Sequence, residues 1–249
     1  MRFLLLLHAL ILSSSCFSQA SIKDSSILVT EIKMSGAAQV PVGQLAQRFS
    51  TNASIGLEVY VKTPSQLGFG LQGTFIFGNN VKETSILDGL RDSNGQIIDL
   101  NGEYARVLLQ ERGFTITGQF GYLIPVLSPN PNSGILLKFG AGFMSHKIRI
   151  GTEKNPVPQL TGEYLKGYDR LTYGLTLQQF VGYQYLNNRR MINFFFGFEI
   201  FEGFTKNRRA YNFDQVQADH SMRTDILTGI RAGWILPLYP RPAKAMYFN

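Results

Sequence analysis

The chain has 249 residues, 44% of them hydrophobic, which is enough to bury the core of one all-β domain or of two smaller ones. Inside it no run reaches the roughly 18 to 20 apolar residues that a spanning helix needs, which argues against a helical membrane protein. The net charge of +7 comes from scattered basic residues, so we expect anionic lipid headgroups rather than nucleic acid as the counter-charge.

The first 20 residues have the pattern of a signal peptide. A basic residue precedes the apolar run 3–12, and Ser18 and Ala20 supply small residues at both positions that a signal peptidase reads. The only cysteine, Cys16, lies in this segment without the leucine that a lipoprotein signal places three residues earlier. We therefore expect an exported protein whose mature part, residues 21–249, forms one domain without disulfides.

Eight segments of the chain alternate apolar with polar or small residues. In residues 171–185 one face carries Leu175, Leu177 and Val181, and the other carries Thr176 and Gln178. A period of two predicts β-strands with one face in an apolar medium. The eight predicted strands are residues 27–36, 54–62, 67–77, 114–124, 135–147, 171–185, 192–205 and 225–238.

The links between these segments alternate in length along the chain. The short links are residues 63–66, 125–134 and 186–190, and the long ones are 37–53, 78–113, 148–170 and 206–224. Outer-membrane barrels have short periplasmic turns and longer extracellular loops. We therefore predict a closed antiparallel eight-stranded transmembrane β-barrel with both termini in the periplasm. The alternative is a soluble periplasmic β-sandwich or lipocalin-like barrel with the apolar face as its core.

The polar faces of the strands carry charges of both signs. Eight strands leave an interior just wide enough for side chains to fill, so a general porin is disfavoured and the lumen charges should pair. For Glu199 the candidate partners are Lys138 and Arg231. The predicted lumen network consists of Glu31, Lys33, Glu58, Lys62, Lys138, Glu199, Asp225 and Arg231.

The signal segment, the eight amphipathic strands and the alternating links together resemble the small outer-membrane barrels of the OmpA and OmpX type. The loop sequences at 41–43, 129–134 and 166–171 look like those of outer-membrane proteins of Bacteroidota. The resemblance covers residues 27–238 and implies an outer-membrane location, but it carries no catalytic residues. Such barrels usually end on a terminal aromatic residue, whereas here residues 239–249 follow the last strand, and we expect an extra periplasmic contact from this tail.

The longest link, residues 78–113, has the marks of a folded loop. Residues 81–90 place apolar side chains at helix-like spacing, and Asn94-Gly95 and Asn101-Gly102 are hairpin turn signals. The oxygen-bearing residues Asp92, Asn94, Gln96 and Asp99 faintly resemble a calcium loop, but the glutamate at its twelfth position is missing. An ordinary Asn-Gly turn is the preferred interpretation.

Enzymatic interpretations find little support in the residues. Asp219-His220-Ser221 contains the residue types of a nucleophilic triad, but neighbours in an extended loop point in different directions. By the strand phase His146 faces the lumen and is expected to be a satisfied interior residue. No Cys/His cluster is present, so we expect neither a metal nor a cofactor.

A basic segment in the last long loop has two open interpretations. Lys206, Arg208 and Arg209 form a contact for lipopolysaccharide phosphates or an acidic partner, or they are a solvated charge cluster beside the membrane.

The sequence as a whole predicts a non-enzymatic outer-membrane barrel that acts through its extracellular loops. Its expected role is structural, or that of an accessory subunit in a secretion or barrel-assembly complex, with outer-membrane lipid, lipopolysaccharide and other envelope proteins as partners. The alternatives are a lipid- or peptide-processing enzyme with its site at the barrel rim and a narrow channel.

Overall fold

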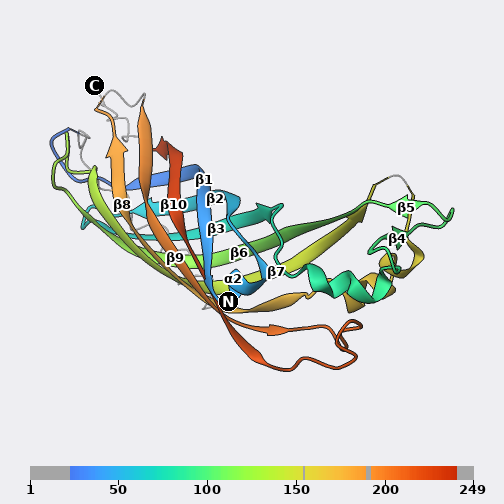
Figure 1. The fold of residues 1–249 in the computed structure, drawn as a ribbon. Coiled ribbons are helices and arrows are strands. Elements are labelled where there is room, and N and C mark those ends of the chain that lie inside the picture. Colours follow the sequence, from blue (N-terminus) through green and yellow to red (C-terminus); the bar gives the residue numbers. More distant parts are fainter. Residues whose placement is uncertain (1–22, 154, 189–191, 240–249) are drawn as a thin grey trace, which may run out of the picture.

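The chain folds into a closed antiparallel β-barrel in the computed structural model, which describes residues 23–153, 155–188 and 192–239 (Figure 1). Each strand pairs with its neighbour in sequence, and the last strand closes on the first. The signal peptide predicted for residues 1–20 and residues 240–249 of the predicted tail lie outside the described residues. The barrel strands are β1 (Val29–Gly43), β2 (Asn52–Lys62), β3 (Leu67–Gly78), β6 (Val107–Ile124), β7 (Gly134–Thr152), β8 (Thr172–Leu186), β9 (Asn193–Asn207) and β10 (Met222–Leu238).

The register of the strands fixes the width of the barrel. Pairs followed from Phe196 on β9 through β10, β1 and the remaining strands return to β9 at Lys206, ten residues further along. Strand number and this stagger together set the tilt and the diameter. The interior is therefore narrow enough for side chains to fill it.

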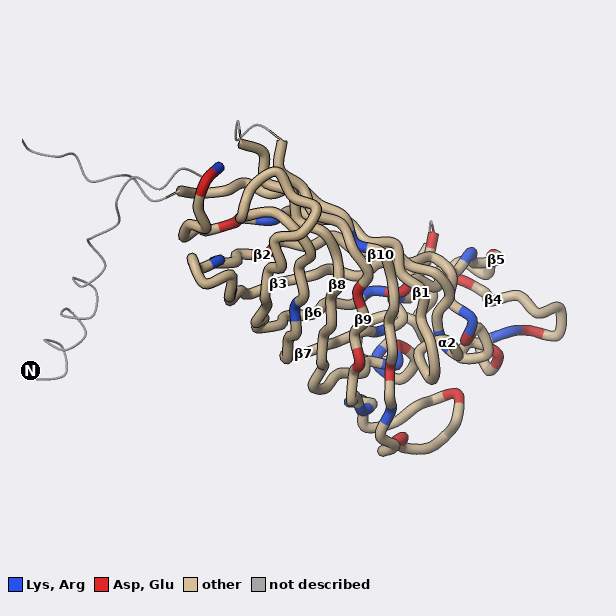
Figure 2. The backbone as a smooth tube through the Cα atoms, turned by 90° about the vertical axis from the view of Figure 1, so that its left-hand side faces the viewer, with Lys and Arg blue, Asp and Glu red and all other residues tan. Residues whose placement is uncertain are grey.

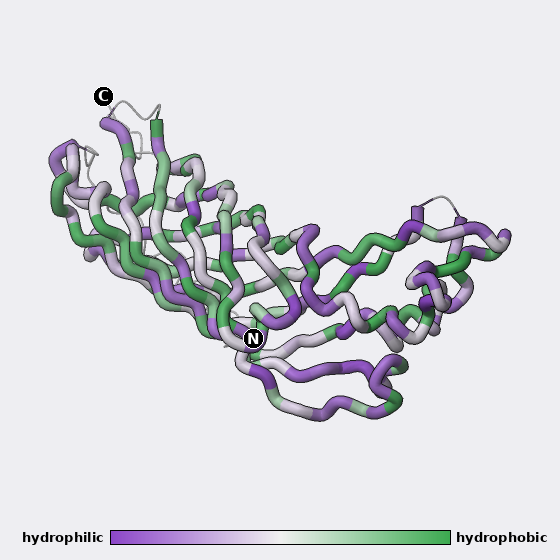
Figure 3. The backbone as a smooth tube through the Cα atoms, in the orientation of Figure 1, coloured by the Kyte–Doolittle hydropathy of each residue, from purple (hydrophilic) through white to green (hydrophobic). Residues whose placement is uncertain are grey.

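Side chains on the outer wall are largely apolar and exposed. Large side chains more than half exposed occur on strands all around the barrel, among them Met34, Phe69, Leu71, Phe139, Leu175 and Ile230. The inward side chains of the same strands are polar and buried, and Figure 3 shows the resulting alternation along each strand. This outside-in pattern is that of a barrel in a bilayer, where closure leaves no unpaired strand edge in lipid. The predicted closed eight-stranded transmembrane barrel is confirmed.

Aromatic residues lie on the outer wall toward both ends of the strands. Tyr122 and Trp234 lie toward the end with the short links, which we call the turn end, and Phe204 lies toward the opposite loop end. Rings at these levels are the interfacial girdles of outer-membrane barrels. The membrane-facing belt therefore lies between them.

β1, β6 and β7 extend furthest beyond their predicted bounds at the loop end. β1 continues to Gly43, so the first predicted long link, 37–53, shrinks to residues 44–51 and holds the short helix α2 (Leu45–Arg48). Pro41 interrupts the pattern there, but it pairs only with Leu227 of β10, since the β2 ladder ends at Gln39. Its missing N–H therefore leaves no gap in the ladder.

The β6–β7 hairpin projects beyond the rest of the barrel at the loop end (Figure 1). β6 begins at Val107 and β7 ends at Thr152, whereas pairing of β3 with β6 stops at Glu111. The predictions of 114 and 147 for these two bounds were wrong because residues 107–112 show no alternation. Among the described residues no helix is long and apolar enough to cross a membrane.

The longest link is folded as predicted. Its helix-like stretch forms the 3-10 helix η1 (Thr84–Leu90), and strands β4 (Ile97–Ile98) and β5 (Tyr104–Ala105) form a small separate sheet. Gly95 and Gly102 have φ angles of 76° and 80°, the left-handed conformation that such turns require. The next long link carries η2 (Pro158–Leu160) and η3 (Tyr164–Gly167).

The close approach of β6 to β7 makes Gly142 a sensitive position. A Cβ there would overlap the carbonyl oxygen of Ile116, whereas a Cβ at Gly73, on the outer wall of β3, would meet nothing within 4 Å. We expect Gly142→Leu to destabilise the barrel by about 4 kcal/mol or more. Unboiled samples of this variant should lose the compact, SDS-resistant band of a folded barrel, and Gly73→Leu should keep it. Retention of the band by Gly142→Leu would contradict the β6–β7 register.

Candidate functional site

Four charged side chains of alternating sign lie together inside the barrel near the turn end. Lys33 on β1 approaches Glu31 at 2.9 Å and Glu58 at 3.7 Å, and Lys138 on β7 reaches Glu58 at 2.7 Å. All four are at most 3% exposed. Each buried charge thus has an opposite charge in contact, which offsets the desolvation that burial imposes.

A second buried pair joins β9 and β10. The guanidinium of Arg231 donates to both oxygens of Glu199, at 2.7 and 2.8 Å, and also to the hydroxyls of Ser35 and Ser54. Gln39 donates to the same carboxylate at 2.9 Å. Bidentate geometry gives the strongest form of such a pair. Of the two predicted partners of Glu199, Arg231 forms the ion pair with it, whereas Lys138 forms its ion pair with Glu58.

Neutral polar and apolar side chains fill the rest of the lumen. Gln72, Gln119 and Gln178 bond to one another, and Thr117 donates to Gln178 at 2.7 Å. Apolar clusters close both ends: one at the turn end includes Tyr60, Phe180, Phe195, Leu123 and Ile235, and one at the loop end includes Phe49, Met144, Phe201 and Leu227. The charged layer is therefore sealed from water on both sides.

The other two residues of the predicted network lie apart from it. Lys62 is at the turn end, where its ammonium donates to Asn132 at 3.0 Å and Ser26 at 2.9 Å. Asp225 is at the loop end, 2.9 Å from the ring of His146, which faces inward as the strand phase predicts. The eight predicted residues thus form two ion-pair groups and two outlying sites.

At the loop end, Arg170 ties several loops together. Its guanidinium contacts Glu83, before η1, at 3.0 Å and Asp214, in the loop between β9 and β10, at 2.6 Å. Arg48 of α2 reaches the other oxygen of Glu83 at 3.1 Å and donates to Thr172 of β8. Every link at the loop end contributes to this set, which we call the Arg170 network (Arg48, Glu83, Arg170, Thr172 and Asp214).

The backbone and the charge of Arg170 both depend on these contacts. Its φ of 51° lies in the left-handed region, which costs a non-glycine residue about 1 kcal/mol or more. Burial by itself would lower the pKa of the guanidinium, but the hydrogen bonds and charges of Asp214 and Glu83 raise it overall. The side chain is only 2% exposed, so the network is a buried clamp rather than a surface pair.

A second contact fixes the loop between β9 and β10 against η3. Arg209 forms a two-pronged pair with Asp169, whose hydrogen bond raises the pKa of the guanidinium. The ring of Phe213 packs edge-on against Tyr168 at 5.5 Å and lies where Gly167 has no Cβ. Ion pair and ring packing together hold this loop on the neighbouring one.

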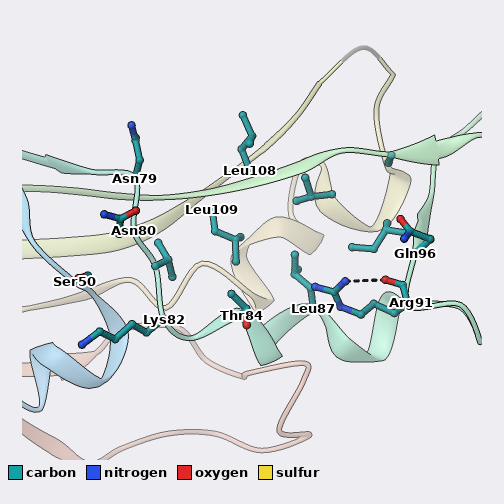
Figure 4. A pocket seen from close by; sticks show the side chains of 15 residues that line it. Ser50, Asn79, Asn80, Lys82, Thr84, Leu87, Arg91, Gln96, Leu108 and Leu109 are labelled. Carbon is teal, nitrogen blue, oxygen red and sulfur yellow. Dashed lines mark hydrogen bonds between the residues drawn. The ribbon is translucent and has the colours of Figure 1, made fainter.

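A cleft of about 480 Å³ opens between η1 and β6 on the outside of this assembly (Figure 4). Its polar side carries Asn79, Asn80 and Gln96, and Leu87 and Leu109 line its apolar side. The cleft therefore offers both apolar surface and amide groups to whatever contacts the loops.

The structure divides the predicted basic cluster, because Lys206 and Arg208 both lie against Tyr173 on the outer wall whereas Arg209 turns to Asp169. Arg209 is bound to Asp169, whereas Arg208 lies outside the barrel with its guanidinium 4.4 Å from the ring centre of Tyr173. Lys206 is also on the outer wall, where its register partner on β8 is Tyr173. Figure 2 shows the charged residues of the loop end beside the largely uncharged strands.

The two catalytic or metal patterns in the loops form ordinary turns. Asp92 accepts the backbone N–H groups of Asn94 and Gln96, and Asp99 accepts those of Asn101 and Glu103. The Ser221 hydroxyl donates to Asp219 at 2.6 Å, so His220 is not placed to take its proton. Within the described parts of the chain, no group of three or more His, Cys, Asp or Glu side chains is placed to hold a metal ion.

The fold and these contacts define the class of protein, a small transmembrane barrel with a sealed lumen and cross-linked loops. The sequence matches no protein-family profile, and comparison with curated proteins gives no match. Among solved structures, two of Ail, the attachment invasion locus protein of Yersinia pestis, are similar at 9% identity. One, in complex with the heparin analogue sucrose octasulfate, has a TM-score of 0.43 over 84% of this chain and 99% of that one; the other has 0.40 over 85% and 99%.

We expect Arg231→Met to destabilise the barrel by about 3 to 5 kcal/mol, because Glu199 would remain as a buried charge without its counter-ion. Adding Glu199→Leu should recover most of the loss, because the uncompensated carboxylate is then gone. Urea unfolding in detergent micelles, followed by the fluorescence of Trp234, the only tryptophan, measures both changes. Equal stabilities of the native chain and the single variant would contradict the pairing.

Arg170→Gln should loosen the loops and leave the barrel folded. With about 3 kcal/mol lost from the network, protease cleavage within residues 79–106 and 208–221 should rise about 100-fold, while the SDS-resistant band persists. Arg106→Gln is the matched control, because Arg106 is 75% exposed in its pair with Glu153. Equal cleavage of the two variants would show that Arg170 does not hold the loops.

Proposed function

We propose that this protein is a non-enzymatic barrel of the outer membrane whose loop end forms a rigid platform for binding another envelope protein. The observation that supports this proposal is a set of exposed apolar side chains on loops that the Arg170 network holds in place. In this proposal the loops are extracellular and both termini are periplasmic. The partner belongs to a complex such as a secretion or barrel-assembly machine.

The exposed apolar side chains lie well beyond the aromatic belt, so lipid does not explain them. Leu100, between β4 and β5, is 66% exposed, and Tyr104 of β5 is 65% exposed. Tyr164 and Val216, on the two loops that Asp169 and Arg209 join, are 65% and 72% exposed. Tyrosines often anchor the partner at protein interaction sites, and these four exposed side chains are the anchors in this proposal.

The cross-links between loops favour recognition rather than a loose surface. A loop that is ordered before binding loses less conformational entropy when it meets its partner. Arg170, Arg48 and Arg209 each join segments that are far apart in the chain. The platform is therefore organised before any partner arrives.

The filled interior and the loop geometry weigh against the two alternatives. Conduction would need a water-filled path through the barrel. Paired charges fill the lumen, and an apolar cluster closes each of its ends. A rim enzyme would need a nucleophile beside a base, and the hydroxyl of Ser221 is directed to Asp219. Display of the loops is the role that remains.

The orientation in the membrane is open to a direct labelling test, because the single native cysteine lies at position 16. Ser93 and Ser65 are both exposed, at the loop end and the turn end respectively. In intact cells a membrane-impermeant maleimide should label Ser93→Cys and leave Ser65→Cys unlabelled until the cells are lysed. The reverse pattern would place the platform on the periplasmic side.

Removing the exposed apolar anchors should weaken partner binding without unfolding the barrel. We expect Leu100→Ser with Tyr104→Ser to lower recovery of the partner about tenfold or more after cross-linking in membranes and affinity purification. Leu127→Ser is the control, since Leu127 is 93% exposed at the turn end. Equal recovery with all three chains, or no partner with any of them, would count against the platform.

A further inference from the structure

Basic side chains gather on one part of the outer wall, just beyond the belt at the loop end. Arg112 on β6 and Lys147 on β7 are register partners, and Arg149 is the next outward residue on β7. Lys206 and Arg208 extend the same arc around β9. We call these five residues the basic arc.

The basic arc forms no direct ion pair within the described residues, and only the buried carboxylate of Glu111 lies close enough to Arg112 to interact with its charge. None of its five residues forms an ion pair with a carboxylate in the described residues, although Arg112 donates to the backbone oxygen of Glu111 and to Gln110. The outward carboxylate Glu202 is separated from Lys206 by Phe204 along β9. Exposed cations at a membrane surface that form no ion pair within the protein attract anionic headgroups.

An apolar groove lies directly below Arg112 on the same wall. It has a volume of about 530 Å³, and it forms where Gly73 carries no side chain between bulky neighbours. Phe114, the outward residue next to Arg112 on β6, borders the groove. Its walls are Met34, Ile55, Leu57, Phe75, Phe114 and Ile116.

We propose that this wall binds one kind of membrane lipid, an acylated lipid with an anionic phosphate headgroup. The phosphate contacts Arg112, Lys147 and Arg149, and an acyl chain fills the groove at Gly73. Guanidinium groups suit this headgroup because their donors match the oxygens of a phosphate. Basic arc and groove meet at Phe114, so a single lipid reaches both.

The two parts of the site are tested by different substitutions. Purified protein is placed in nanodiscs of equal amounts of phosphatidylglycerol and phosphatidylcholine, and native mass spectrometry counts the lipids that each barrel retains. We expect the native chain to retain mainly phosphatidylglycerol. Arg112→Gln with Lys147→Gln and Arg149→Gln should reduce this preference about tenfold, toward the ratio in the bilayer.

Gly73→Leu should lower the number of retained lipids of both kinds, because its side chain occupies the groove. The matched charge control is Arg91→Gln with Arg106→Gln and Lys166→Gln, which removes the same charges from exposed loop positions. This control should keep the native preference, and all variants should keep the SDS-resistant band.

The proposal is overturned if the native chain shows no preference for phosphatidylglycerol, or if the arc variant keeps the native preference. An equal loss of preference in the charge control, or unchanged lipid retention in Gly73→Leu, would also overturn it. Partner recovery by the loops is measured separately, so failure of the lipid site leaves the platform untouched.

Discussion

Closure of the sheet between β1 and β10 is the constraint on which the other features depend. In lipid every strand edge must be paired, and a stagger of ten residues over eight strands permits only one diameter. That diameter leaves room for side chains and none for a pore. Charges on the inner faces must therefore find partners among themselves, and the surfaces that closure leaves free are the loops and the outer wall.

The alternation along each strand made it possible to predict which residues face inward. It did not make it possible to predict which of these residues pair inside the lumen. A period of two places Glu199, Lys138 and Arg231 on one side of the wall, whatever their partners are. Which cation meets Glu199 depends on the register around the whole barrel, which sets Arg231 opposite Gly197 and therefore next to Glu199. Register is a long-range property, and no local pattern encodes it.

The loop site was predicted only in its local parts. The turns at Asn94-Gly95 and Asn101-Gly102 could be predicted because they need a left-handed φ, which glycine adopts readily, and the Asn-Gly pair is visible in the local sequence. Arg170, Glu83 and Asp214 carried no such signal, since their contact joins three loops from distant parts of the chain. The strand segment 107–112 could not be predicted for another reason. It lies outside the membrane-facing belt, where neither face of a strand needs to be apolar, so the alternation is absent.

The Arg170 network also fixes an order of assembly. Its members come from the four links at the loop end, so it can form only when the strands that flank every one of these links have come together. The ladder from β1 to β10 is complete without it, whereas the clamp requires every hairpin to be in place. The loop surface is therefore complete only in a barrel whose last strand has already paired with its first.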